Sequence, residues 1–63
     1  MIKLTKLNGK RFYLNVFQIK TMKAIPETKI KMMDNDYYLV KETIEEVQKK
    51  IEDFWRLRLG DEQ

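Results

Sequence analysis

Residues 37–47 read YYLVKETIEEV, and within this stretch the spacing of apolar residues changes. Before it, apolar and polar residues alternate, as in Ile2-Lys3-Leu4, which is the period of a strand with one buried face. After it, apolar residues recur every three or four positions, which is the period of a helix packed on one side. The sequence therefore predicts an α+β chain in which the strands come first and one C-terminal α-helix follows.

The helix is expected at about residues 44–59. Thr43 and Glu46 have the spacing of a capping box, in which the hydroxyl accepts from a backbone N–H of the first turn and the Glu carboxylate accepts in return. Gly60 supplies a stop, and residues 60–63 are expected to fray. The apolar stripe of this helix consists of Ile44, Val47, Ile51, Phe54, Trp55 and Leu59.

Turn signals divide the alternating part of the sequence into five short strands. Asn8-Gly9 is typical of a hairpin, and Pro26-Glu27-Thr28 and Asp34-Asn35-Asp36 separate the later strands. Because consecutive strands joined by short turns pair antiparallel, we expect one curved meander or a small open barrel. The expected strands lie near residues 2–7, 11–15, 19–25, 29–33 and 37–41.

The position of the first turn decides which residues pair. A three-residue turn over residues 8–10 pairs Leu4 with Leu14, and a three-residue turn over residues 26–28 follows the same logic, because a slip by one residue would turn every side chain to the other face. These registers collect on one face Ile2, Leu4, Phe12, Leu14, Val16, Met22, Ala24, Ile30 and Met32. The apolar residues left for a second face are Ile19, Ile25, Tyr13, Met33, Tyr38 and Val40. We therefore expect a sheet that needs two covers or curls into a barrel.

Composition excludes several classes of site. The chain has 63 residues and neither Cys nor His, so disulfides, thiolate chemistry and His-based metal or nucleophile sites are excluded. No apolar run approaches the roughly 20 residues that span a membrane, and no signal-peptide region is recognisable. We expect one domain over residues 1–63, cytoplasmic and not an enzyme, with no cofactor or metal. A chain this short buries a thin core, so a partner or a second copy is expected.

The acidic residues do not point to catalysis or metal binding. Asp34 and Asp36 lack the Gly and the distal Glu of a calcium loop, so we interpret them as turn residues. Glu42, Glu45 and Glu46 lie where the positive end of the helix dipole stabilises carboxylates.

Charge is distributed unevenly along the chain. Residues 1–33 carry a net charge of +7 and residues 34–63 a net charge of −4. The basic half is either the solvent-facing side of the strands or a surface for nucleic acid or an acidic partner. Lysines interleaved with Phe12, Tyr13, Tyr37 and Tyr38 would suit RNA, unless these rings pack within the sheet.

The end of the helix carries more apolar bulk than one stripe can bury, because Leu57 lies off the stripe. Trp and Arg are enriched in binding hot spots, so this end either docks onto a partner or a second copy, or wraps the edge of the sheet. The predicted partner-binding residues are Phe54, Trp55 and Arg58, with an electrostatic patch of Lys20, Lys23, Lys29 and Lys31.

Several segments together resemble a known family. They are MIKLTKLNG (1–9), FYLN (12–15), Ile19, PET (26–28), IKM (30–32), YLVKET (38–43) and EEV (45–47). Over about residues 1–52 this ordered set is similar to the FlbD/SwrD family of small flagellar proteins, with departures at Lys23, where an acid is common, and Asp36, where Gly is common. The resemblance implies a bacterial cytoplasmic protein that supports swarming and flagellar motor power, through the ion-driven stator units. It implies no enzymatic activity and carries over no catalytic or ligand residues.

The order of five strands and a helix is also similar to that of the carbon storage regulator proteins, which dimerise to bind RNA. Their arginine motif at a strand edge has no counterpart in this sequence. The sequence therefore predicts a flagellar interaction protein that contacts stator or motor components, with a small basic RNA- or DNA-binding module as the alternative. A third interpretation is a structural subunit that needs a larger partner to be stable.

Overall fold

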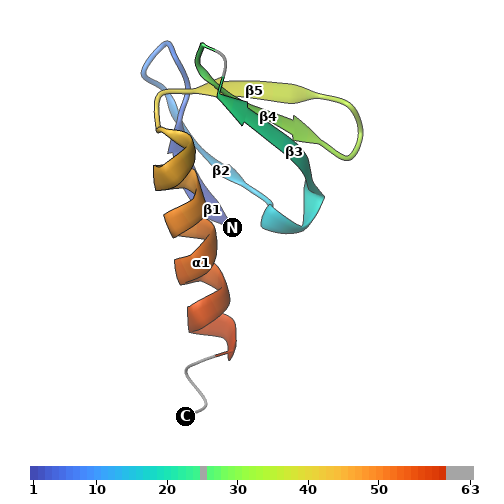
Figure 1. Cartoon of the computed structure of the whole chain (residues 1–63), viewed down its shortest axis with the longest axis vertical. Helices are drawn as coiled ribbons and strands as arrows, with labels where there is room; N and C mark the ends of the chain where they lie inside the picture. Colours follow the sequence, from blue (N-terminus) through green and yellow to red (C-terminus); the bar gives the residue numbers. More distant parts are fainter. Residues whose placement is uncertain (25, 60–63) are drawn as a thin grey trace.

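The computed structural model describes residues 1–24 and 26–59, and it has the expected α+β order of strands followed by one helix (Figure 1). The elements of the described residues are β1 (Ile2–Thr5), β2 (Arg11–Leu14), the 3-10 helix η1 (Val16–Gln18), β3 (Ile19–Ala24), β4 (Thr28–Met32), β5 (Tyr37–Val40) and α1 (Ile44–Leu59). The expectations for Ile25, for Gly60 and for residues 61–63, and those that involve the side chain of Leu59, lie outside the described residues.

The strands form two antiparallel sheets, so the expected single meander or barrel is wrong. β1 pairs with β2, and β3, β4 and β5 form a separate three-stranded sheet. Between β2 and β3 the chain turns through η1, which Asn15 caps by accepting from the Phe17 N–H at 3.0 Å. The sheets meet instead where β1 and β5 end: Lys6 bridges Val40, and the Lys41 N–H donates to the Thr5 carbonyl at 2.8 Å.

The first hairpin turn has the expected length but begins one residue earlier. The Gly9 N–H donates to the Lys6 carbonyl at 2.9 Å, and the Lys6 N–H donates to the Lys10 carbonyl at 2.8 Å, which leaves residues 7–9 rather than 8–10 in the turn. The third residue of such a turn takes a left-handed conformation, and Gly9 has a φ of 91°. The need for this φ fixes the place of the turn.

The register of the first hairpin is therefore shifted by two residues from the expected one, and that of the β3–β4 hairpin is shifted by two residues as well. Leu4 pairs with Phe12 rather than Leu14, and Met22 pairs with Ile30. A shift of two leaves each side chain on the expected face, because side chains alternate with a period of two. The buried hydrophobic core of the described residues consists of Ile2, Leu4, Leu14, Ile30, Met32, Val40 and Val47.

The three-stranded sheet has one apolar face, whereas the sequence led us to expect two. A bulge between Ile19 and Thr21 interrupts the alternation on β3, and Ile19 packs against the core. Tyr38 and Val40 on β5 also belong to this core side. Two further residues assigned to the second face are exposed, namely Tyr13 and Met33. The outer face of the β3–β4 hairpin is therefore left to polar side chains.

Helix α1 begins at the predicted capping box, which is confirmed. The Glu46 N–H donates to the Thr43 hydroxyl oxygen at 3.1 Å, and the Thr43 N–H donates to the Glu46 carboxylate at 2.8 Å. Val47 is fully buried, and Ile51 and Phe54 follow at helical spacing and pack against the core. In Figure 1 the helix runs beside the β1–β2 hairpin, and its second half projects away from the three-stranded sheet.

Candidate interaction surfaces

Three aromatic rings pack edge to face where η1 meets the second half of α1. The ring centroid of Phe17, on η1, lies 5.9 Å from that of Phe54 and 5.4 Å from that of Trp55, and the two α1 rings are 5.4 Å apart. Edge-to-face pairs at these distances stabilise one another beyond the apolar area that they bury. These three residues together with Arg58 are called the aromatic cluster below.

The Arg58 guanidinium lies over two rings of the aromatic cluster. Its central carbon is 5.8 Å from the ring centroid of Phe17 and 5.7 Å from that of Phe54. Phe17 is 56% exposed and Trp55 is 37% exposed, so the cluster remains open to solvent. Rings held in place by neighbouring rings and by a cation, yet open to solvent, are suited to contact another protein, because they lose little conformational freedom on binding.

The cluster contains the three helix residues predicted from the sequence and one residue that the prediction missed. Phe17 was not among the predicted partner-binding residues because it lies outside the helical stripe. Its position is set by Asn15, whose side chain accepts from the Phe17 backbone N–H and starts η1. Asn followed by a short apolar segment is a sequence signal for such a cap, and that signal could have identified the turn.

The structure also brings together the four predicted lysines, on the outer side of the β3–β4 hairpin. Lys23 on β3 lies directly opposite Lys29 on β4, and Lys31 lies opposite Thr21. These residues line a shallow hollow of about 260 Å³. The four lysines are called the lysine face below; they are Lys20, Lys23, Lys29 and Lys31. The lysine face and the aromatic cluster lie on different elements and form two surfaces, not one.

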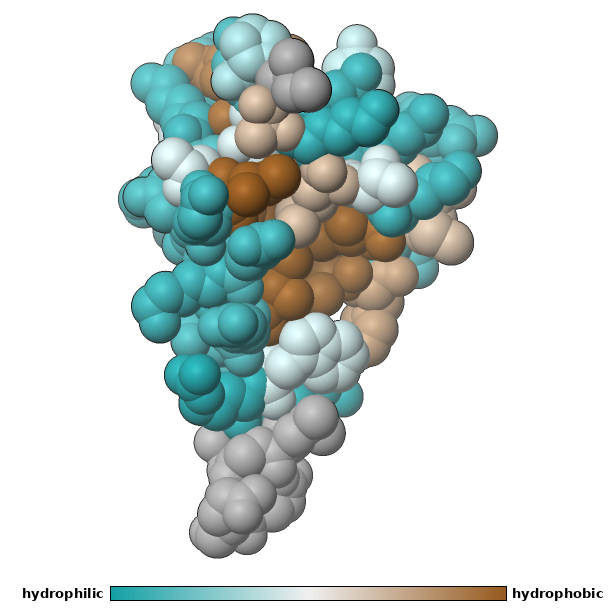
Figure 2. All heavy atoms as spheres, in the orientation of Figure 1, coloured by the Kyte–Doolittle hydropathy of each residue, from teal (hydrophilic) through white to brown (hydrophobic). Residues whose placement is uncertain are grey.

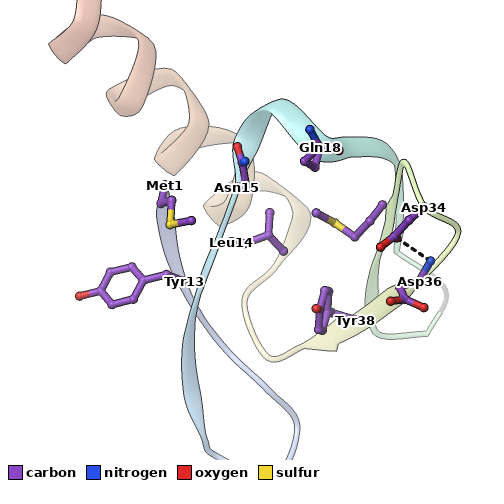
Figure 3. A pocket seen from close by; sticks show the side chains of 9 residues that line it. Met1, Tyr13, Leu14, Asn15, Gln18, Asp34, Asp36 and Tyr38 are labelled. Carbon is purple, nitrogen blue, oxygen red and sulfur yellow. Dashed lines mark hydrogen bonds between the residues drawn. The ribbon is translucent and has the colours of Figure 1, made fainter.

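A second hollow opens between the two sheets (Figure 3). It measures about 260 Å³, and side chains from β2, η1, β4, β5 and the last turn line it, with Tyr38 and Leu14 among them. At its rim the Asp34 carboxylate accepts from the Asp36 N–H at 3.0 Å, drawn as a dashed line in Figure 3. This bond belongs to the turn, as expected.

A partly buried hydrogen-bonded contact joins the residues just before α1 to the first strand. The Glu42 carboxylate accepts from the Thr5 N–H at 3.0 Å and from the Thr5 hydroxyl at 2.9 Å. Partial burial raises the pKa of Glu42, but the hydrogen bonds from Thr5, that from its own N–H and the charge of Lys50 outweigh it and lower the pKa below its ordinary value. The sequence suggested only a dipole role for Glu42, since its partner lies 37 residues away.

Apolar surface remains visible between α1 and the three-stranded sheet, whereas the outer side of the helix is hydrophilic (Figure 2). The residues that pack against the core but stay partly exposed include Val16, Met22, Ile51 and Phe54. These partly exposed residues form the open margin of the core, and Phe54 belongs both to this margin and to the aromatic cluster. The open margin of the core therefore continues into the cluster.

Comparison with known proteins gives one family. The family model described as "FlbD: Flagellar and Swarming motility proteins" matches residues 1–57. Searches of curated proteins and of solved structures gave no match. Within the described part of the chain, no helix has the length and apolar character needed to cross a membrane. The match covers nearly the whole sequence and agrees with the segments that carried the resemblance, so this chain belongs to the FlbD family of flagellar and swarming motility proteins.

Proposed function

We propose that this protein is a non-enzymatic component of the bacterial flagellar system that increases motor output by docking onto a stator or motor protein through the aromatic cluster. The observation that carries the proposal is the exposure of Phe17 and Trp55 in a cluster that Arg58 and edge-to-face packing hold in place. A few residues supply most of the binding free energy at a protein interface, and aromatic residues and Arg are enriched there.

Two further features support docking rather than chemistry. The chain lacks Cys and His, the residues that most often act as nucleophile or general base at neutral pH. The margin of the core is open beside the cluster, and contact with a partner would remove more apolar surface from water there. Both features are consistent with a protein that acts by binding.

The proposal places the protein in the cytoplasm, recruited to the motor at the inner face of the membrane. It also includes self-association, because a core of seven buried hydrophobic residues among those described is small and is partly open. A second copy at the open margin would cover apolar surface that the chain does not cover itself.

Binding of RNA or DNA stays the alternative prediction. That prediction depended on aromatic rings among the lysines, and two of the four rings considered, Phe12 and Tyr38, instead pack on each other at 4.9 Å and against the core. Tyr13 lies on β2, in the other sheet. A base-stacking platform on the lysine face would therefore rest on Tyr37, whose ring is already covered by the Lys29 ammonium at 4.3 Å. This geometry favours the protein partner.

The test is a binding measurement between the purified chain and purified cytoplasmic portions of stator and motor proteins. The variant Phe17→Ser removes an exposed ring of the cluster, and Tyr13→Ser removes an exposed ring from β2 as a matched control. We expect Phe17→Ser to weaken binding by at least about tenfold, as for an interface hot spot, and Tyr13→Ser to change it little. Equal binding by both variants, with both folded, would exclude the cluster as the docking site. Binding of labelled RNA that falls steeply with salt would favour the alternative.

A further inference from the structure

Strand β3 lies at an edge of the three-stranded sheet and is the longest strand of the described chain. It covers six residues, Ile19–Ala24, and pairs with β4 on one side. Among the described residues no backbone hydrogen bond reaches Lys20–Ala24 from the other side. Most of the strand is exposed, including Lys20, Thr21 and Lys23. An edge of this kind offers N–H and C=O groups to an added strand.

The lysine face adjoins this edge and lacks acidic partners in the part of the chain that is described. The ion pairs among the described residues lie on α1, where Asp53 pairs with Lys49 and with Arg56. Lys23 and Lys29 stand directly opposite each other, an arrangement that destabilises a sheet. Folding thus holds together like charges, and an anionic ligand would neutralise them.

Protection of an exposed edge is a common role for lysine, and it accounts for Lys20 and Lys23 on β3. It does not account for Lys29 and Lys31, because these lie on β4, the central strand of the sheet. The row of lysines therefore extends further into the sheet than edge protection requires.

We infer that the β3 edge and the lysine face together bind an extended acidic segment of a partner protein, which adds to the sheet as a fourth strand. Backbone groups of the segment would pair with β3, and every second side chain would point to the lysine face, because side chains alternate along a strand. A carboxylate on this side of the segment would then lie beside Lys23 and another near Lys20 at the bulge, with Lys29 and Lys31 in the next row. This contact goes beyond the proposed function, since it uses a surface separate from the aromatic cluster and does not require a motor protein as the partner.

A peptide fits these observations better than the other polyanions. A nucleic acid or a lipid headgroup can neutralise the lysines but cannot complete the backbone hydrogen bonds of β3. The hollow on the lysine face is lined by Thr21 and the four lysines, and the aromatic ring beside it, that of Tyr37, is already covered by the Lys29 ammonium at 4.3 Å.

The experiment titrates the full-length chain with a fluorescent peptide of about eight residues that alternates Glu and Val, long enough to cover β3. A second peptide has the same sequence with alternate backbone nitrogens methylated, so that it keeps its charge but cannot donate along one edge. We expect the first peptide to bind and to shift the amide resonances of β3, and the methylated peptide to bind at least about tenfold more weakly.

Two variants with the same change of charge separate the lysine face from general attraction. Lys23→Glu should weaken binding at least about tenfold, whereas Lys10→Glu, at the exposed residue after the first turn, should weaken it less than about twofold. Lys23→Glu should keep the fold, because it replaces a like-charge pair across the strands with an opposite-charge pair. Phe17→Ser should bind the peptide as the unsubstituted chain does. The failure of this proposal can therefore be told apart from the failure of the docking proposal.

Four outcomes would overturn the inference: no binding of the peptide, equal binding of the methylated peptide, equal losses in Lys23→Glu and Lys10→Glu, or tighter binding of mixed-sequence RNA or of anionic phospholipid vesicles at the same salt concentration. The last outcome would assign the lysine face to nucleic acid or to a membrane surface.

Discussion

Glu42, the residue before the helix cap, is joined to the first strand through its charged carboxylate. It accepts two hydrogen bonds from Thr5 on β1 and lies immediately before the helix cap. Its pKa is lowered in the folded chain, so the folded state favours the ionised carboxylate. This contribution to the free energy of unfolding is present above the ordinary glutamate pKa of 4.5 and is lost as the pH falls through the lower value of the folded state.

The first prediction follows from this contact. Glu42→Gln should lower the free energy of unfolding at pH 7 by about 1 kcal/mol, since hydrogen bonds to a charged group are stronger than neutral ones but this one is partly exposed to water. Urea unfolding at pH 7 and at pH 3 measures it, and the difference from the unsubstituted chain should shrink at pH 3. Glu45→Gln, with no such partner among the described hydrogen bonds, is the control. A difference that persists unchanged at pH 3 would contradict the role of the charge.

The second prediction concerns two turns of the same shape. Asn35 occupies the position in the last turn that Gly9 occupies in the first, with a φ of 74° against 91°. Gly9→Ala should lower the free energy of unfolding by about 1–2 kcal/mol through backbone strain alone, because a Cβ there would meet no atom within 4 Å. Asn35→Gly should raise it by roughly 0.5 kcal/mol, because Gly adopts this conformation without strain. Thermal unfolding of both variants tests the pair, and a loss of stability in Asn35→Gly would show that the Asn side chain matters more than its φ.

Within α1, the capping box is the feature most directly encoded by neighbouring residues. Thr43→Ala should cost about 1 kcal/mol of stability, because it leaves the Glu46 N–H without its partner. Adding Glu46→Ala should cost less than a second independent substitution would, since the two hydrogen bonds are reciprocal. Chemical unfolding of the two single variants and the double variant provides the test. Strict additivity would show that the two bonds act separately.

The elements that the sequence predicted are those whose cause is local. The strand faces follow from alternation, and the helix start follows from Thr43 and Glu46. The division into two sheets was missed, because it depends on whether Asn15 begins a 3-10 turn or continues the strand. The second apolar face was wrongly predicted: Ile19 reaches the core side through a bulge on β3, and Tyr38 and Val40 lie on the core side through their pairing with β4.

The candidate surfaces, like the elements, were predictable where local periodicity places the residues and not where the path of the chain does. Alternation placed Lys23, Lys29 and Lys31 on one side of the β3–β4 hairpin, and Lys20 joins them only through the bulge after Ile19. Helical spacing placed Phe54, Trp55 and Arg58 near one another. Phe17 joins them only through the path of the chain after Asn15, and Thr5 meets Glu42 only after both sheets have formed. Contacts between residues so far apart leave no periodic signal in the sequence.

For the molecule as a whole, elongation is the property that bears on function. The radius of gyration is 12.0 Å, and the extents are 39 × 23 × 19 Å, whereas a compact chain of this length would have a radius of about 11 Å. The helix, which rises about 1.5 Å per residue, reaches past the sheets and carries the aromatic cluster on its second half. A partner or a second copy is therefore expected beside this part of the helix.

The open margin of the core predicts that the chain associates with itself. Sedimentation equilibrium should show an average mass that rises above the 7.7 kDa of one chain as the concentration increases into the high micromolar range. The physical reason is burial of the open core margin, which is favourable in proportion to the apolar area removed from water. A single species of monomer mass across the whole range would contradict it.

The most direct test of the docking account is the torque of single flagellar motors in cells that carry this protein with Phe17→Ser in place of the unsubstituted chain. We expect reduced torque at high load with normal protein abundance, and torque near the unsubstituted level in cells with the control Tyr13→Ser. Full torque with Phe17→Ser at normal abundance would contradict the claim that the aromatic cluster connects this protein to the motor.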